Sequence, residues 1–135
     1  KSVKNKVSIE HVYPQTPTAE YWNVQFIGYN DEQKKVLTGS IGNLVALSQQ
    51  KNSSLQNDEF PLKKVSQKDH KGYKDGSHSE IEIADNTDWN PGAIRKRGLD
   101  LLAFMEKRWD IQFENSRAKE DLLFLNFMNS EDDSL

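Results

Sequence analysis

The sequence predicts an α+β domain in which a short two-stranded sheet is surrounded by helices. Residues 6–12 alternate apolar and polar side chains, which is the pattern of a β-strand, and residues 44–47 form a short apolar run typical of a buried strand. Residues 91–109 carry apolar side chains at helical spacing behind a proline. With 135 residues the chain can close one modest core, although a hydrophobic content of 35% leaves long polar surfaces or loops.

The first strand begins at about Lys6 and should end near Tyr13. Val7 and Ile9 lie on one face of it, because side chains alternate between the two faces along a strand. Pro14 has no backbone N–H to donate to a sheet, so it stops the strand. The threonine and proline residues that follow are typical of a turn.

Helices and one further strand are expected before residue 60. A short helix is predicted over residues 19–27, and Asn30 can cap the next helix with Gln33 as its capping-box partner. Gly39 and Gly42 should break that helix. The remaining elements of this half are a second strand over residues 44–47 and a helix that begins at about Gln49.

The second half of the chain predicts mainly helices and polar surface. Residues 63–74 are basic and poorly patterned, so we expect a helix and a loop at the surface. Residues 79–83 alternate in polarity and predict an edge strand. Asn90 followed by Pro91 marks the start of the helix over residues 91–109. The other expectations are a last helix over about residues 117–128, a frayed acidic tail at residues 130–135, and core positions for Trp89, Met105 and Trp109.

Several classes of protein are excluded by the composition. The chain has no cysteine, so disulfides and cysteine-bound zinc are excluded and an intracellular setting is expected. No apolar run approaches the roughly 20 residues of a membrane span, and no signal peptide is visible. No P-loop or dinucleotide-binding glycine motif occurs, so we expect no nucleotide cofactor. The chain does not begin with methionine, and we expect a domain excised from a larger protein.

Charge is unevenly distributed along the chain. Residues 1–74 carry 11 Lys/Arg and 7 Asp/Glu, a net charge of +4, whereas residues 75–135 carry 7 Lys/Arg and 14 Asp/Glu, a net charge of −7. A polyanionic substrate would be attracted to the first part and repelled by the second. Chance segregation of charge in a small domain accounts for the same numbers equally well, so charge only supports a conclusion reached on other grounds.

Two short segments carry the residues for one kind of chemistry. Glu10 and His11 are adjacent, and Asn43 and Asn52 follow nine residues apart. Hydrolysis of a phosphodiester needs a base that activates water and positive charge that stabilises the transition state. His11 suits the first task because imidazole titrates near neutral pH. Glu10 and Asn52 offer oxygen ligands to one hard cation such as Mg²⁺ or Mn²⁺.

Strand geometry raises an objection to this arrangement. Successive side chains on a flat strand point to opposite faces, so Glu10 and His11 cannot both face one point. We therefore expect a bend or bulge at the pair, for which Pro14 gives a reason, and a cleft shared by His11 and Asn52. Both asparagines also suit purely structural roles, since Asn43 can stabilise a turn and Asn52 can be a helix N-cap.

These segments resemble the HNH endonuclease superfamily, also called the His-Me finger or ββα-metal fold. The resemblance rests on Glu10-His11 at a strand end, Gly42-Asn43-Leu44 before the second strand, and Asn52 nine residues after Asn43. The wider strings at residues 9–15, 42–44 and 51–57 resemble the C-terminal HNH domain of GmrSD-type modification-dependent restriction endonucleases and related phage-defence proteins. The resemblance reaches the segment from Trp89 to Trp109, although only the first 60 residues are specific.

The resemblance implies a metal-dependent endonuclease that nicks or cleaves DNA, with His11 as its general base. It implies that Glu10 and Asn52 hold one divalent metal, Mg²⁺ or Mn²⁺, and that Asn43 is a catalytic-site residue that fixes the loop and helps to orient His11. The acid is Glu rather than the more familiar Asp, and the last position is Asn rather than His. An all-oxygen site of this kind disfavours zinc.

The same resemblance implies the surroundings of the site. A single domain would have a ββα-metal core at about residues 6–60 and a helical C-terminal extension at about residues 87–129. It would act as the effector of a restriction or anti-phage defence protein in the cytoplasm of a bacterial or archaeal cell. Its partners would be the phosphate backbone of DNA and an N-terminal sensor domain of the parent protein. Substrate contacts are expected from Lys51, Asn57, Lys63 and Lys64, unless the lysines simply form a solvated face.

Two other functions stay open. The Glu and Asn replacements and the acidic second half are compatible with a degenerate nuclease fold that binds nucleic acid without hydrolysing it, and the substrate of an active enzyme can be RNA instead of DNA.

His70 and His78 are expected to be exposed loop histidines rather than metal ligands. Either Arg95 or Arg97, on the helix over residues 91–109, can reach the substrate.

Overall fold

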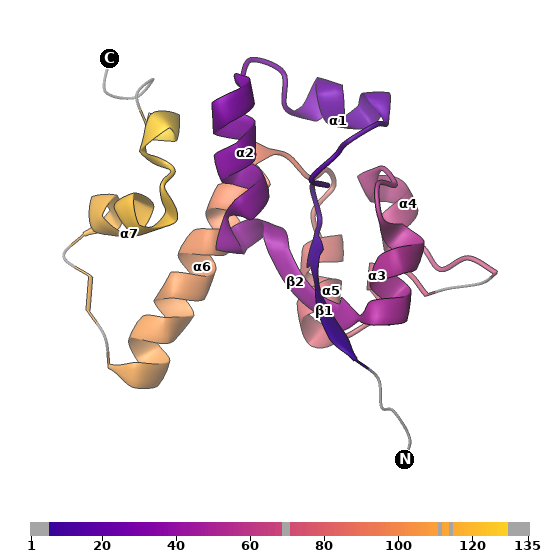
Figure 1. The fold of residues 1–135 in the computed structure, drawn as a ribbon. Coiled ribbons are helices and arrows are strands. Elements are labelled where there is room, and N and C mark those ends of the chain that lie inside the picture. Colours follow the sequence, from indigo (N-terminus) through magenta and orange to yellow (C-terminus); the bar gives the residue numbers. More distant parts are fainter. Residues whose placement is uncertain (1–5, 69–70, 111, 114, 130–135) are drawn as a thin grey trace.

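Two short strands and a set of helices make up the fold (Figure 1). A computed structural model describes residues 6–68, 71–110, 112–113 and 115–129 of the chain. In chain order the strands and helices are β1 (Val7–His11), α1 (Glu20–Gln25), α2 (Asp31–Gly39), β2 (Leu44–Ser48), α3 (Gln49–Leu55), α4 (Phe60–Lys64), α5 (His78–Ala84), α6 (Pro91–Trp109) and α7 (Ser116–Leu123). Short 3₁₀ segments occur at η1 (Ile41–Asn43), η2 (Tyr73–Asp75) and η3 (Asn126–Asn129). His70 and the acidic tail at residues 130–135 lie outside the described residues.

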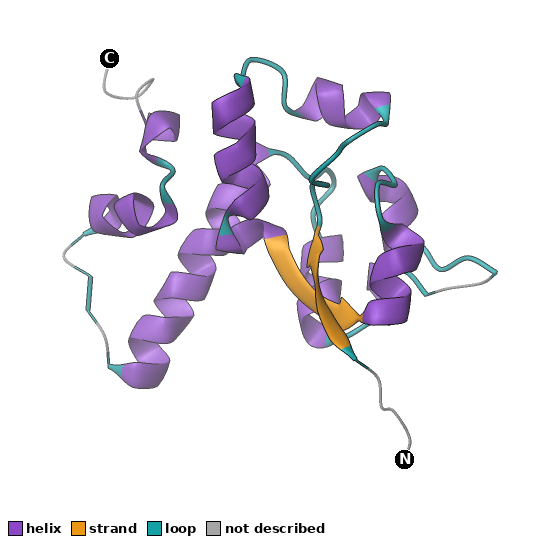
Figure 2. Ribbon diagram, viewed as in Figure 1, coloured by secondary structure: helices purple, strands orange, loops and turns teal. Residues whose placement is uncertain are grey.

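β1 and β2 form a two-stranded antiparallel sheet, so the predicted α+β class with two short strands is confirmed. The register is regular from Val7, opposite Ser48, to His11, opposite Leu44. Figure 2 shows this small sheet among helices and connecting loops. α3 follows β2 directly and packs against both strands.

The two faces of the sheet have opposite environments. Val45 and Leu47 of β2 are buried, and Glu10 lies opposite Val45 on the same face. Val7 and Ile9 share the other face, as predicted, but they are 72% and 54% exposed. Because the protein covers the face that carries Glu10, an acidic side chain rather than an aliphatic one enters the interior from β1.

Local sequence signals account for most helix boundaries. Asn30 caps α2, and the Gln33 side chain accepts from the Asn30 backbone N–H, which is the predicted capping box. Asn90 caps α6, whose observed limits match the prediction. The helix predicted to begin at about Gln49 is α3. Its N-cap is Ser48, so the N-cap role considered for Asn52 is wrong.

Two parts of the second half differ from the prediction. Residues 79–83 lie in helix α5 and do not form an edge strand. Ser77 and Glu80 form a capping box at the start of α5, which stabilises a helix where the alternating polarity favoured a strand. The last predicted helix is shorter than expected, because α7 ends at Leu123 and the next residue, Phe124, has a left-handed backbone with a φ of 60°.

Aromatic side chains from separate segments form part of the core. Tyr13, just after β1, stacks on Phe26 at the end of α1, with 3.7 Å between ring centroids. Trp89 is fully buried, as predicted, and Met105 packs against the core while partly buried. Trp109 is 57% exposed, so its predicted core position is wrong. It lies at the C-terminal end of α6, the end that extends away from the sheet (Figure 1).

The close approach of η1 to α6 depends on Gly42. A Cβ atom at this position would lie 2.0 Å from the Ile94 carbonyl oxygen and 2.8 Å from the Gly98 nitrogen, both of which are backbone atoms. We therefore expect Gly42→Ala to lower the free energy of unfolding by about 2 kcal/mol or more, since two backbone segments must move apart. Urea denaturation of the purified chain measures this loss.

Gly39→Ala is the matched control for that substitution. Gly39 ends α2, and among the described residues outside its own helix no atom would lie within 4 Å of its Cβ. We expect the free energy of unfolding to change by less than about 1 kcal/mol, in the stabilising direction. Equal stabilities for the two variants would show that η1 and α6 can separate without cost.

Candidate active site

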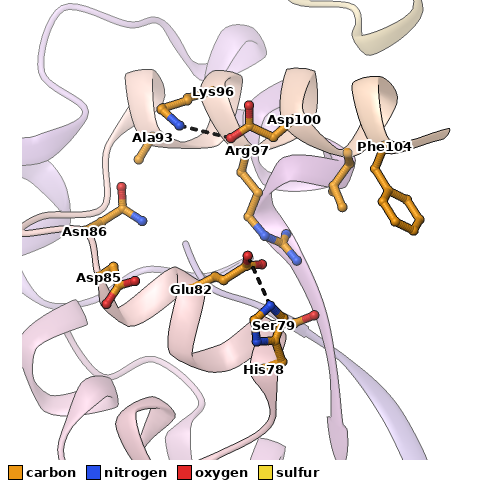
Figure 3. A pocket seen from close by; sticks show the side chains of 11 residues that line it. His78, Ser79, Glu82, Asp85, Asn86, Ala93, Lys96, Arg97, Asp100 and Phe104 are labelled. Carbon is orange, nitrogen blue, oxygen red and sulfur yellow. Dashed lines mark hydrogen bonds and ion pairs between the residues drawn. The ribbon is translucent and has the colours of Figure 1, made fainter. Parts of the chain in front are cut away.

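A cavity of about 640 Å³ lies between α5 and α6 (Figure 3). Polar and charged side chains on its walls contact one another: Lys96 lies 3.0 Å from Asp100, and His78 lies 3.4 Å from Glu82. Arg97 turns its Nη1 away to donate to backbone carbonyls of η1 and β2. None of the residues predicted for catalysis or metal binding lines this cavity, so its size is no guide to the chemistry.

A smaller cleft of about 290 Å³ lies at the end of β1, where predicted site residues meet. The residues that line it are Ile9, Glu10, His11, Pro14, Gln15, Thr16, Asn52, Gln56 and Asn57. The cleft therefore joins the acid–histidine pair of β1 to two asparagines, one on α3 and one in the turn after it. The other predicted site residues, which do not line the cleft, are Asn43, Lys51, Lys63 and Lys64.

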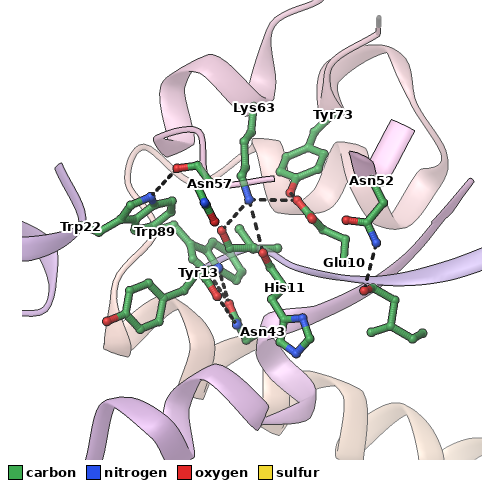
Figure 4. Close-up of polar contacts among 12 residues, drawn as sticks. Glu10, His11, Tyr13, Trp22, Asn43, Asn52, Asn57, Lys63, Tyr73 and Trp89 are labelled. Carbon is green, nitrogen blue, oxygen red and sulfur yellow. Dashed lines mark hydrogen bonds and ion pairs between the residues drawn. The ribbon is translucent and has the colours of Figure 1, made fainter. Parts of the chain in front are cut away.

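The Glu10 and His11 side chains leave β1 in opposite directions (Figure 4). Both residues belong to a regular antiparallel pairing, so the expected bend or bulge does not occur at the pair itself. The chain bends immediately afterwards, at Val12 and Tyr13. Because the strand ends here, side chains from both of its faces border one cleft, and His11 and Asn52 share that cleft as expected.

Asn43 holds the bend that follows β1, and its side chain is fully buried. Its Oδ1 accepts from the Tyr13 backbone N–H at 2.8 Å and from Trp89 Nε1 at 2.9 Å. Its Nδ2 donates to the carbonyls of Tyr13 at 3.0 Å and Thr38 at 2.9 Å (Figure 4). These bonds use the whole amide, so Asn43 is a positioning residue for the backbone after His11 and not a group that meets a substrate.

Glu10 points into the interior, where Lys63 and Tyr73 hold one of its oxygens. Glu10 is 2% exposed, and its Oε2 accepts from the Lys63 ammonium at 2.9 Å and from the Tyr73 hydroxyl at 2.6 Å. Lys63 is fully buried, so the prediction that it faces a substrate at the surface is wrong. The physical reason is that the side of α4 that carries Lys63 packs inward, and Glu10 supplies the charge that a buried ammonium requires.

The same burial shifts the acid–base properties of both partners of Glu10. Burial lowers the pKa of the Lys63 ammonium, and the Glu10 carboxylate partly opposes this effect. Burial also raises the pKa of the Tyr73 hydroxyl well above its ordinary value, and the Glu10 carboxylate raises it further. The neutral, hydrogen-bond-donating form of Tyr73 is therefore favoured.

The second oxygen of Glu10 and the amide oxygen of Asn52 remain available for a cation. Among the described residues, Oε1 of Glu10 accepts no hydrogen bond. Asn52 Nδ2 donates to the Ile9 carbonyl at 3.0 Å, and because a carbonyl only accepts, Asn52 Oδ1 must point elsewhere. Two oxygen donors beside a water-accessible cleft fit a hard divalent cation that keeps most of its water shell.

A cation at this place would depend on that mixed pair of donors. Within the part of the chain that the structure describes, no cluster of three or more His, Cys, Asp or Glu side chains is arranged to hold a metal. One carboxylate oxygen and one amide oxygen alone would bind a cation weakly. Such a pair suits Mg²⁺ or Mn²⁺ that is also coordinated by a substrate phosphate, and it does not suit a structural metal whose ligands all come from the protein.

The surroundings of His11 favour its neutral imidazole form. Partial burial lowers the pKa of His11 below its ordinary value of 6.5. The neighbouring Glu10 carboxylate raises this pKa to a smaller extent, and the Lys63 ammonium lowers it again. Among the residues that the structure describes, the ring has no hydrogen-bond partner, so its nitrogens are free to take a proton from water in the cleft.

The remaining predicted substrate contacts lie in different settings. Asn57 borders the cleft, and its carbonyl accepts from Trp22 Nε1 at 3.3 Å, which anchors the turn after α3. Lys51 forms an ion pair with Glu80. Lys64 donates to a backbone carbonyl at 2.9 Å. Both lysines are therefore engaged away from the cleft, and the structure does not bring them together with Asn57.

Gln56 and Tyr73 contribute to this region but were not among the site residues predicted from the sequence. Gln56 lines the cleft one turn after Asn52, a helical spacing that could have identified it. Tyr73 donates to Glu10 across 63 residues of sequence. No local pattern marks Tyr73 out, so only the folded structure reveals it.

The model of the family described as GmrSD restriction endonucleases, C-terminal domain, matches residues 1–104. This match confirms the GmrSD-type resemblance found in the sequence, and its span contains the whole cleft. No curated protein and no solved structure matches the chain. None of the helices in the described ranges is long and apolar enough to cross a membrane.

Proposed function

We propose a function from one finding: the chain belongs to the family of GmrSD restriction endonuclease C-terminal domains. The proposed function is that of a metal-dependent endonuclease that hydrolyses phosphodiester bonds of DNA. The family itself indicates a nuclease, and therefore a hydrolase, of the restriction type. The observation that carries the finer proposal is the cleft at the end of β1, where His11, Glu10 and Asn52 meet. The reaction needs a general base and oxygen ligands for a cation, placed at a cleft that water can enter.

A ββα-metal core of the HNH type is part of this proposal. β1 and β2 pair antiparallel, and α3 follows β2 at once and packs on both strands. The acid and the base lie at the end of the first strand, Asn43 lies just before the second strand, and Asn52 lies on the helix. This order of elements and residues supports the HNH assignment.

His11 is the general base of the proposed reaction. Its lowered pKa favours the neutral imidazole, which accepts a proton from the water that attacks phosphorus. Glu10 Oε1 and Asn52 Oδ1 would hold one divalent cation, Mg²⁺ or Mn²⁺. When bound, the cation supplies positive charge that offsets the charge developing on the phosphate and on the leaving oxygen. Asn43 keeps the backbone beyond the base in place throughout.

The substrate and partners follow from the same assignment. Asn57 borders the cleft and offers an amide to the phosphate backbone. The net charge of +4 on residues 1–74, which include the cleft, supports attraction of a polyanion. A restriction nuclease must spare the DNA of its own cell, so we assign control of cutting to an N-terminal sensor domain of a parent protein, in the cytoplasm of a bacterial or archaeal cell.

One observation favours a second candidate, a module that binds nucleic acid without hydrolysing it. Glu10 is 2% exposed and already lies 2.9 Å from the Lys63 ammonium, so its carboxylate has a counter-charge in the absence of any metal. Such a module predicts DNA binding that weakens with salt and is indifferent to a metal chelator.

A plasmid-nicking assay separates the two candidates. We expect the purified chain to convert supercoiled plasmid to the nicked or linear form in the presence of Mn²⁺ or Mg²⁺, and to lose this activity in excess EDTA. DNA binding without cleavage at any metal concentration would support the binding module instead. RNA offered in the same assay shows which nucleic acid is cut, and a clear preference for RNA would contradict the DNA assignment.

A further inference from the structure

Lys63 has its ammonium group enclosed in the protein at the strand end that carries the proposed site. The side chain is 0% exposed, and Nζ donates to Glu10 Oε2 at 2.9 Å, to the Val12 carbonyl at 2.9 Å and to the His11 carbonyl at 3.3 Å (Figure 4). An ammonium has three N–H donors, so these three acceptors satisfy it completely. All of them belong to consecutive residues at the end of β1.

Enclosing this ammonium carries a large desolvation cost unless it is paired. Of the three acceptors just named, one is a carboxylate, that of Glu10, which would itself lie in the interior without a counter-charge if Lys63 were absent. The other two acceptors are the backbone of the proposed base and of the residue that begins the bend. One side chain from α4 therefore neutralises the proposed metal ligand and also fixes the backbone of the proposed base.

We propose that Lys63 is a positioning residue that acts as a built-in counter-cation for Glu10 and holds the catalytic strand end in place before a metal binds. The inference rests on the proposed function, because it concerns the carboxylate assigned to the metal. The Tyr73 hydroxyl donates a hydrogen bond of 2.6 Å to the same Glu10 Oε2 that accepts from Lys63. Glu10 is thereby restricted to Oε1 for contact with a cation.

A counter-cation and a purely structural lysine predict different responses to metal. If Lys63 only packs and bonds the backbone, its removal lowers stability equally with and without metal. If it balances the charge of Glu10, a divalent cation on the free oxygen replaces part of what is lost, so the variant gains more from metal than the unmodified chain gains. Loss of a purely structural lysine would leave the Mn²⁺-induced change in thermal stability as it is in the unmodified chain, so this change distinguishes the two roles.

Thermal unfolding of the full 135-residue chain, with and without saturating Mn²⁺, tests this inference. Lys63→Met nearly preserves the length of the side chain and removes its charge. Without metal we expect its melting temperature to fall by about 10 °C or more, because it leaves a buried carboxylate unpaired. We expect Mn²⁺ to raise the melting temperature of this variant by more than it raises that of the unmodified chain.

Lys64→Met is the matched control. Lys64 is the next residue on α4, but its ammonium donates to the Asn86 carbonyl at 2.9 Å and lies 4.9 Å from the centroid of the Phe60 ring, away from the cleft. Its variant should show the same Mn²⁺ shift as the unmodified chain. An equal shift in Lys63→Met would overturn the counter-cation role.

A double variant keeps the test decisive if Lys63→Met does not fold. Lys63→Met combined with Glu10→Gln removes both charges, so it should melt at a higher temperature than Lys63→Met alone and should lose the Mn²⁺ response. A double variant no more stable than the single one, including failure of both to fold, would overturn the inference. Absence of any Mn²⁺ shift in the unmodified chain would refute the metal assignment of the proposed function, and this inference would fall with it.

Discussion

Replacing His11 with alanine is expected to slow DNA cleavage by about 100- to 10,000-fold while leaving the fold and the response to metal intact. The His11 side chain is only partly buried and borders the cleft, so its truncation removes little packing. The substitution takes away the group that accepts the proton of the attacking water. Single-turnover nicking with Mn²⁺ measures the rate, and the Mn²⁺-induced shift in melting temperature measures whether the cation still binds.

His78→Ala is the matched control for this substitution. His78 lies on α5, its side chain is 87% exposed, and it does not line the cleft, so we expect an unchanged rate. If His11→Ala cleaves DNA as fast as the unmodified chain, His11 is not the base. If it loses the Mn²⁺ shift together with the activity, His11 is a metal ligand instead.

The pH dependence of cleavage tests the same residue without a substitution. A general base works in its deprotonated form, and burial places the pKa of His11 below the ordinary value of 6.5. A lowered pKa extends the neutral form to more acidic pH, so the rate should be level from about pH 7 upward. Below the pKa of His11 it should fall about tenfold for each pH unit. A rate that keeps rising from about pH 7 to pH 9 would indicate a base with a higher pKa.

The elements that could be predicted from the sequence depend on signals that act over a few residues. The capping box of α2 and the asparagine–proline start of α6 satisfy backbone groups within a single turn, so neighbouring residues alone determine them. The spacing from Asn43 to Asn52 is informative for a related reason. β2 is short and runs directly into α3, so nine residues bridge one strand and half of one helix. If Asn43 lies just before β2, Asn52 must therefore lie on α3.

The features that could not be predicted depend on contacts between distant residues. Lys63 belongs to a basic segment and resembles a solvated lysine, yet its ammonium bonds Glu10 across 53 residues. Trp109 continues the apolar stripe of α6, but it lies at the end of the helix that extends away from the sheet, where its side chain is 57% exposed (Figure 1). Glu10, His11 and Asn52, which border the cleft, could be anticipated from the motif. The charge that neutralises Glu10 could not, because α4 carries no pattern that specifies which side faces inward.

Replacing Asn43 with alanine is expected to lower the free energy of unfolding by about 3–5 kcal/mol. Alanine leaves the Tyr13 backbone N–H and the Trp89 indole N–H enclosed without their acceptor, and each unsatisfied donor costs about 1–3 kcal/mol. A domain of this size has about 5–15 kcal/mol of stability in total, so urea denaturation will show the loss clearly. Asn23→Ala, which removes an exposed side-chain bond on α1, is the control and should change the free energy by less than about 0.5 kcal/mol.

Asn43→Asp separates the two halves of this network. Aspartate keeps an oxygen for the N–H groups of Tyr13 and Trp89, but its second oxygen replaces the Nδ2 that donates to the carbonyls of Tyr13 and Thr38. Oxygen then faces oxygen in the interior, so we expect a loss of stability comparable with that of alanine at neutral pH. The loss should shrink as the pH falls, because a protonated carboxyl can again donate. If Asn43→Asp is as stable as the unmodified chain at neutral pH, the Oδ1 bonds alone hold the bend that follows His11.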